Sequence, residues 1–187
     1  MKNHRRPLLL LLLVFVAPLA FAFWLYYGSH WRPALRTNHG ALIDPPIALP
    51  ALPIGGGSAN ALTVKWSLLV VGAGESGCEA SCRVALVYAR QTWLSLGKLS
   101  PRVQRVLLAG ESCCDRNYLR AEHQGLAVAQ LPDSAVARVL ALLPLPLDHT
   151  IFIVDPLGNL MMRYDVRQDP KGLREDLKNL LELSHIG

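Results

Sequence analysis

Apolar positions are most concentrated near the N-terminus, where Leu8 to Tyr27 contain no charged side chain. As a helix, this 20-residue run would be about 30 Å long, which matches the hydrocarbon core of a bilayer. Basic residues within the segment 1–6 precede the run, and aromatic residues between 23 and 27 end it. Basic flanks favour the cytoplasmic side and aromatic residues favour the interface. The pattern predicts a cytoplasmic flank and a transmembrane anchor in residues 1–27, with the rest of the chain outside the cytoplasm.

A cleaved signal peptide is the alternative interpretation of the same segment. Ala20-Phe21-Ala22 has the small-x-small pattern of a cleavage site after a shorter apolar core. The apolar run continues beyond this point, which favours an anchor. Both alternatives place the downstream chain on the same side of the membrane.

Residues 28–61 interrupt the apolar pattern and are rich in Pro, Gly and Asn. Pro45-Pro46, Pro50, Pro53 and the glycines at 55–57 exclude a regular helix here. We expect a tether that carries the following domain away from the bilayer, with its later part along the domain edge.

The periodicity of residues 62–187 predicts one α/β domain. Strands are expected at 63–71, 103–108, 150–154 and 160–164. Helices are expected at 78–96, at 134–142 and after Asp169. In the last helix Pro170 takes the first position, and one apolar stripe consists of Leu173, Leu177, Leu180 and Leu181. The polar segment 113–124 is ambiguous. A strand–helix–strand start implies parallel pairing and the later hairpin implies antiparallel pairing. We therefore expect a mixed sheet with flanking helices, which is the thioredoxin-like arrangement.

The main candidate site is the pair Cys78 and Cys82, between the first strand of the domain and the following helix. Cysteines four residues apart on a helix share one face. The helix N-terminus lowers the pKa of a thiol and favours the thiolate, which is the form that binds metal or attacks a disulfide. The alternatives are two buried cysteines that act as small apolar residues, or a plain structural disulfide.

His149 is the second candidate, within Asp148-His149-Thr150 directly before a strand. Two thiolates and one imidazole suit a soft or borderline ion such as copper. Asp148 or a backbone carbonyl could orient the ring. Taken alone, His149 is an ordinary histidine at the end of a strand, so the prediction depends on its combination with the cysteines.

Cys113 and Cys114 are adjacent and follow the second strand. Adjacent cysteines rarely pair with each other. One of them could resolve a disulfide with Cys78 or Cys82, or both could offer a second soft-metal site. A structural disulfide and a free surface thiol are equally open.

Other motifs carry less weight. Gly72-x-Gly74-x-x-Gly77 matches the dinucleotide-binding fingerprint, but no acidic residue follows at the required spacing, so we interpret the glycines as a tight turn.

The net charge is +5, yet the basic residues are scattered, which gives no support for nucleic-acid binding. The isolated histidines are expected to be exposed; they are His4, His30, His39, His123 and His185.

The cysteine pair, the distant histidine and the anchor together resemble the Sco/SenC family of membrane-anchored, thioredoxin-like copper proteins of cytochrome c oxidase assembly. Cys78 and Cys82 match the family's C-x-x-x-C pair, and the segment 148–158 is similar to its histidine-containing strand and turn. Glu79 and Arg83 stand where the family has prolines, and segment 111–115 replaces its Asp-rich segment.

The resemblance implies copper bound by Cys78, Cys82 and His149. It also implies a copper-containing subunit of cytochrome c oxidase as partner, and a domain that faces the periplasm from the bacterial inner membrane. A second hypothesis is metal-free thiol–disulfide exchange, with Cys78 as the attacking thiol and Cys82 as the resolving thiol. A third is a non-catalytic accessory protein in which the cysteines form a structural disulfide.

Overall fold

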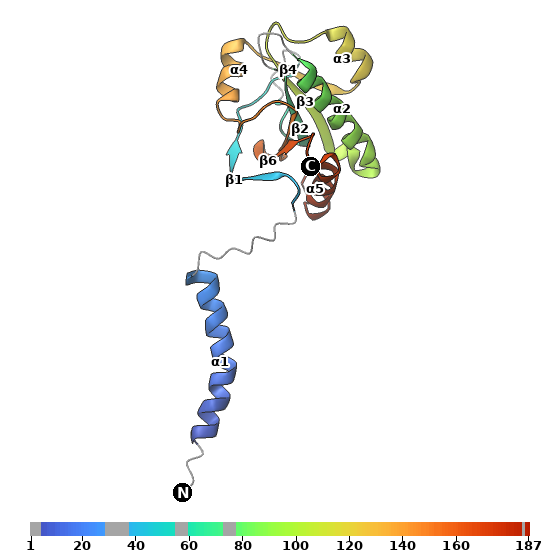
Figure 1. Ribbon diagram of the computed structural model, residues 1–187. Coiled ribbons are helices and arrows are strands. Elements are labelled where there is room, and N and C mark those ends of the chain that lie inside the picture. Colours follow the sequence, from blue (N-terminus) through green and yellow to red (C-terminus); the bar gives the residue numbers. More distant parts are fainter. Residues whose placement is uncertain (1–4, 29–37, 55–59, 73–77, 185) are drawn as a thin grey trace. The chain divides into compact units, whose positions relative to one another are not determined.

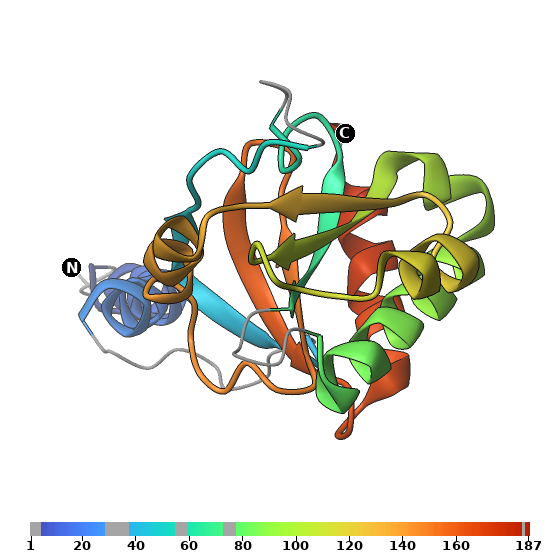
Figure 2. The ribbon, with the colours of Figure 1, turned by 90° about the horizontal axis from the view of Figure 1, so that it is seen from above.

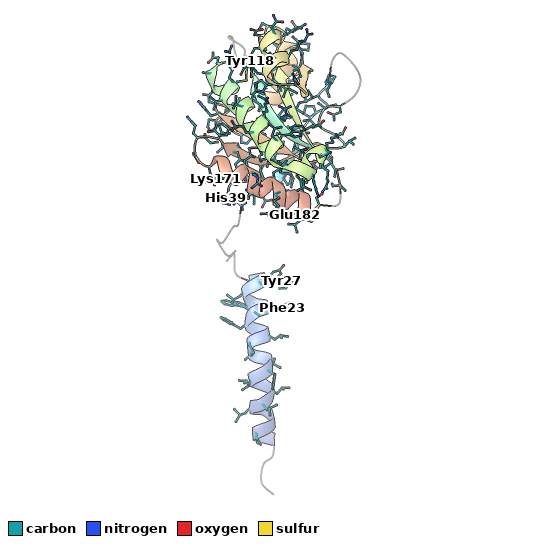
Figure 3. All side chains as sticks on the ribbon, turned by 90° about the vertical axis from the view of Figure 1, so that its right-hand side faces the viewer. Phe23, Tyr27, His39, Tyr118, Lys171 and Glu182 are labelled. Carbon is teal, nitrogen blue, oxygen red and sulfur yellow. A yellow bond between two sulfur atoms is a disulfide. The ribbon has the colours of Figure 1, made fainter. Side chains whose placement is uncertain are left out.

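A computed structural model describes residues 5–28, 38–54, 60–72, 78–184 and 186–187. The chain divides into two compact units, Met1–Thr37 and Asn38–Gly187. The first contains α1 (Arg5–Gly28), in which Leu10–Gly28 is long and apolar enough to cross a membrane. The aromatic rings of Phe23 and Tyr27 are exposed, with centroids 4.7 Å apart (Figure 3). An N-terminal apolar helix of membrane-spanning length is thereby confirmed.

The second unit is built on one mixed sheet with the strand order β1-β6-β5-β2-β3-β4. The strands are β1 (Ala41–Ala48), β2 (Trp66–Gly72), β3 (Val103–Ala109), β4 (Leu126–Gln130), β5 (Thr150–Val154) and β6 (Asn159–Asp165). The central strand β2 runs parallel to β3 and antiparallel to β5, while β5 and β6 form an antiparallel pair. The predicted combination of parallel and antiparallel pairing is therefore confirmed.

Helices cover both faces of the sheet (Figure 2). They are α2 (Ala80–Ser95), the 3-10 helix η1 (Gly97–Arg102), α3 (Arg116–Glu122), α4 (Asp133–Leu140) and α5 (Pro170–Leu183). On β2, Leu68 and Val70 pack with residues of α2 and α5, whereas Leu69 and Val71 pack with residues of α4. The alternation along β2 thus separates two apolar layers, as expected for a strand buried on both faces. This is the predicted thioredoxin-like architecture (Figure 1).

The last helix follows the predicted pattern closely. Asp169 caps α5 by accepting hydrogen bonds from the backbone amides of Lys171 and Gly172, at 3.2 and 2.9 Å. Pro170 occupies the first helical position, where its missing N–H costs nothing. The predicted leucine stripe is confirmed, since its members lie in or against the core: Leu173, Leu177, Leu180 and Leu181.

Three elements differ from the sequence predictions. The segment 41–48, within the predicted tether, forms the edge strand β1 on β6. Prolines 45 and 46 are tolerated there because an edge strand leaves one side of its backbone unpaired. The ambiguous segment contains α3, with Asp115 as its N-cap, and it is followed by β4, which the apolar pattern did not reveal because its first three residues are only half-buried.

A buried carboxylate holds the start of the second unit in place. Asp176 on α5 accepts hydrogen bonds from the backbone amides of His39 and Gly40, at 2.8 and 3.1 Å, and from the hydroxyl of Tyr164. Gly40 is packed so closely that a Cβ there would lie 2.3 Å from the ring of Tyr164. The exposed ring of His39 pairs with Asp169 and Glu175, at 2.9 and 3.1 Å, beside the start of α5 (Figure 3). These contacts fix the chain to the domain from residue 38 onwards.

His123 corrects an expectation, because it is buried and only 2% exposed. Its Nε2 lies 3.3 Å from the hydroxyl of Tyr118, and the two rings meet edge to face. Burial, followed by the charges of Arg105 and Arg90, lowers the pKa of His123, whereas Glu122 opposes the shift. This burial could not be predicted from the local sequence, since His123 lies among polar residues.

Candidate functional site

The topology brings the candidate residues to one edge of the sheet. Cys78 follows the carboxyl end of β2, and Cys113 follows the carboxyl end of β3, which runs parallel to β2. Because β5 is antiparallel to β2, with Val70 paired to Ile151, the start of β5 lies beside the end of β2. His149 directly precedes β5, so it reaches the same edge as the cysteines.

Cys78 and Cys82 form a disulfide, with Cα atoms 5.1 Å apart. Helix α2 begins at Ala80 rather than at Cys78. Cys82 therefore lies in the first helical turn, and Cys78 precedes the helix, which lets the chain bring the two sulfurs together. Both residues belong to the apolar cluster beneath α2, and they are 9% and 6% exposed.

Cys82 and His149 line the same small pocket, of about 130 Å³. Other residues that line it include Glu79, Ser81, Leu147 and Asp148. The pocket thus joins the first turn of α2 to the loop before β5. Sequence reasoning did not select Glu79 or Ser81, although both lie within the C-x-x-x-C spacing.

The backbone of His149 is held by a hydrogen bond, whereas the Nδ1 atom of its ring lacks a partner among the described residues. Its carbonyl accepts a hydrogen bond from the amide of Val166, at 3.0 Å, and its φ is +55°, which is unusual for a residue other than glycine. Within the described residues, its buried Nδ1 has no hydrogen-bond partner. The expectation that Asp148 or a backbone carbonyl orients the ring stays a prediction, since no described residue does so through Nδ1. A buried nitrogen with a free lone pair or proton is costly unless a ligand satisfies it.

An ion pair lies beside His149. Asp165 accepts hydrogen bonds from Nε and Nη2 of Arg167, at 2.9 and 2.7 Å. These bonds are the main cause that lowers the pKa of Asp165 to about 2, and the charge of His149 adds a smaller contribution. The same pair raises the pKa of Arg167. Asp165 is therefore ionised at neutral and mildly acidic pH.

In the disulfide form, the candidate residues do not form a metal-binding group. Among the described residues, no group of three or more His, Cys, Asp or Glu side chains is arranged to hold a metal ion. The two sulfurs are joined in a disulfide, whereas thiolates and not disulfide sulfurs are the strong ligands. After reduction, two thiolates and the unpartnered Nδ1 of His149 would supply the soft and borderline donors that copper prefers.

Cys113 and Cys114 are joined to each other, which corrects the expectation that adjacent cysteines would avoid pairing. Cys113 is buried, Cys114 is half-buried, and Cys114 has a φ of +80°. A Cβ on Gly72 would lie 3.1 Å from the Sγ of Cys113 and 3.4 Å from that of Cys114. A side chain at position 72 would therefore crowd the second pair, whereas Gly74 and Gly77 of the same motif lie outside the described residues.

Comparison with known proteins agrees with this fold. The family model described as transmembrane-like, thioredoxin-like, C-terminal domain matches residues 66–184. A search of curated protein sequences found no match.

Three solved structures share the fold at low sequence identity. Arabidopsis thaliana ScoI with copper bound has 15% identity and a TM-score of 0.55, covering 74% of this chain and 98% of its own. Yeast Sco1 has 14% identity and a TM-score of 0.56, covering 74% and 94%. A SCO1/SenC family lipoprotein from Bacillus anthracis has 13% identity and a TM-score of 0.51, covering 80% and 98%. The fold expected from the Sco/SenC resemblance is confirmed, and the chain belongs to the family of transmembrane-like, thioredoxin-like C-terminal domains.

Proposed function

We propose that this chain is a membrane-anchored copper-binding assembly factor for a membrane-bound cytochrome c oxidase. Cys78, Cys82 and His149 would hold the copper ion. The observation that carries the proposal is that Cys82, which is covalently linked to Cys78, lines one small pocket with His149. The unpartnered Nδ1 of His149 supports it, because a bound cation would satisfy that atom.

The resemblance of the sequence to Sco/SenC proteins suggests the partner and the compartment. The partner would be the copper-containing subunit of the oxidase, and the domain would face the periplasm from the bacterial inner membrane. The candidate spanning helix Leu10–Gly28 supports the anchor. The copper-bound structure of Arabidopsis thaliana ScoI, which shares the fold, supports copper as the cargo.

Reduction of the disulfide is the step that prepares the site. An external dithiol would give two electrons to the Cys78–Cys82 bond, becoming a disulfide itself and leaving two thiols in the protein. Cys82 lies in the first turn of α2, where the helix dipole favours its thiolate. The hydrogen bond from Val166 holds the backbone of His149 beside it. Copper bound there would be available for transfer to a partner with similar soft ligands.

Copper stoichiometry of the reduced full chain in detergent micelles tests the proposal. The protein is loaded with Cu(I) without oxygen, and each variant is measured with and without the Cys113→Ser/Cys114→Ser change, so that the second pair cannot hide a loss. We expect Cys82→Ser to abolish most of the binding and His149→Ala to weaken it by about tenfold or more. His39→Ala is the matched control, since His39 is an exposed histidine outside the pocket. Undiminished copper binding by Cys82→Ser would refute the proposal.

Metal-free thiol–disulfide exchange is the second candidate, and the closed Cys78–Cys82 bond favours it. Cys82 lines the pocket and Cys78 does not, so in this candidate function the roles expected from the sequence are reversed: an incoming thiolate would attack Cys82 and leave Cys78 as the departing thiolate. His149→Ala separates the two functions. It would leave the exchange rate with a dithiol substrate nearly unchanged while copper binding falls.

A further inference from the structure

The Cys113–Cys114 disulfide borders a second and much larger pocket, of about 630 Å³. Both cysteines line it. The apolar part of its wall includes Leu119, Val128 and Leu131. A pocket of this size holds a small organic molecule and not merely an ion.

The polar wall of this pocket is predominantly cationic. Arg116 and Arg120 of α3 line it, and Glu111 is the single acidic residue among the lining residues. The Nη2 of Arg116 donates a hydrogen bond to the Oε1 of Gln130, at 3.0 Å, and Gln130 donates to the carbonyl of Glu111, also at 3.0 Å. The first bond links α3 to β4, and the second links β4 to the segment that follows β3. Guanidinium groups in such a place recognise carboxylates.

We propose that Cys113–Cys114 is a second redox centre, which exchanges with a small anionic thiol, such as a carboxylate-bearing thiol peptide, bound in this pocket. Cys114 is half-buried and Cys113 is buried, so Cys114 is the sulfur that an incoming thiolate reaches. The proposal does not rest on copper binding by the first pair.

The exchange balances with two molecules of the thiol. The thiolate of the first attacks the Sγ of Cys114, forms a mixed disulfide and releases Cys113 as a thiolate. The thiolate of the second attacks the ligand sulfur of that mixed disulfide and releases the thiolate of Cys114. Two electrons pass to the protein, the two ligands leave as their own disulfide, and their protons pass to the protein thiols or to water.

The test uses the full chain in detergent micelles with Cys78→Ser and Cys82→Ser, so that only the second pair can react. Reduction by glutathione, which is anionic, and by neutral 2-mercaptoethanol is followed by acid quenching, alkylation and mass spectrometry. We expect Arg116→Gln/Arg120→Gln to slow the reaction with glutathione about fivefold at low salt, because the attraction of the anionic thiol is lost. The rate with 2-mercaptoethanol should change by less than about twofold, since this reagent carries no charge besides the thiolate that both reagents share. Arg174→Gln, an exposed arginine of α5, is the matched control and should leave both rates unchanged.

Equal slowing with both reagents would overturn the proposal, as would a pair that glutathione reduces only after the protein is unfolded. A second measurement concerns which sulfur is attacked. With oxidised glutathione, the Cys113→Ser variant should form the mixed disulfide on Cys114 faster than the Cys114→Ser variant forms it on Cys113. The reverse order would contradict the assignment of Cys114 as the sulfur that is attacked.

Discussion

Cys78–Cys82 and Cys113–Cys114 are both disulfides at the carboxyl edge of the parallel strands, but the pockets beside them differ in size and chemistry. The first pair adjoins about 130 Å³ of space that it shares with the imidazole of His149. The second adjoins about 630 Å³ of space with two guanidinium groups. The same sulfur chemistry is thus placed beside an imidazole in one case and beside two guanidinium groups in the other.

The comparison indicates that the two sites differ in the residues that surround each cysteine pair, and not in the cysteines themselves. A thiolate pair with an imidazole in a small pocket matches a soft ion. A disulfide beside arginines in a roomy pocket matches an anionic thiol. Gly72 adjoins both cysteine pairs. It is the last residue of β2, the strand that leads to Cys78, and a Cβ added to it would lie 3.1 Å from the Sγ of Cys113.

Gly72→Ala should give the largest effect on stability. The added Cβ would lie 3.0 Å from the Cδ1 of Leu107 and 3.1 Å from the Sγ of Cys113, which is tighter than ordinary contact. We expect a loss of about 1 to 2 kcal/mol in the free energy of unfolding, since the packed neighbours must shift. Urea unfolding monitored by circular dichroism measures it.

A double-mutant cycle assigns the cause of that loss. In a Cys113→Ala/Cys114→Ala background the two sulfurs are absent, so Gly72→Ala should cost less than in the parent chain. An equal cost in both backgrounds would show that Leu107 alone, and not the second pair, requires the glycine.

Acidification should destabilise α3, the helix that lines the pocket beside Cys113–Cys114. The lowered pKa of His123, which follows α3, means that its neutral form is favoured in the folded protein. The unfolded chain takes up a proton near pH 6.5, so the stability of this region should fall as pH decreases from that value toward the lower folded pKa. Hydrogen exchange of α3 amides at pH 7 and pH 5, corrected for intrinsic rates, measures the effect.

His123→Gln is the matched variant, because glutamine keeps a polar side chain without titrating in this range. The pH-dependent loss of protection in α3 should disappear in it, while α5 should behave alike in both proteins. If α3 loosens equally in His123→Gln, a different group is responsible.

Much of the fold followed from the sequence because its signals were local. Runs such as 151–154 are apolar throughout, and Asp169 with Pro170 marks the start of α5. Strand β1 did not follow, because its place depends on pairing with β6, more than 100 residues later in the chain. The two prolines in β1 argued for an irregular tether and are tolerated only because the strand lies at an edge.

In the candidate site, too, features that depend on long-range packing did not follow from the sequence. Spacing selected Cys78, Cys82 and His149, and the topology brings Cys82 and His149 to one pocket. The pairing of Cys113 with Cys114 could not be predicted, because four cysteines allow three connectivities and the sequence does not distinguish them. The pocket of Arg116 and Arg120 was also missed, since it forms only when α3 packs beside β4.

Asp165 gives the smallest expected effect and concerns the surroundings of His149. Its pKa of about 2 lies below the usual value of 3.8, chiefly because of the hydrogen bonds from Arg167. A lowered folded pKa stabilises the protein above the unfolded value, so this contribution should be lost as pH falls from about 4 to about 2. Because Arg167 is largely exposed, we expect Asp165→Asn to cost less than about 1 kcal/mol at pH 7. Urea unfolding at pH 7 and pH 2.5 measures this, and the difference between the parent and the variant should be clearly smaller at the lower pH. A difference at pH 2.5 as large as that at pH 7 would mean that Asp165 acts through packing rather than through its charge.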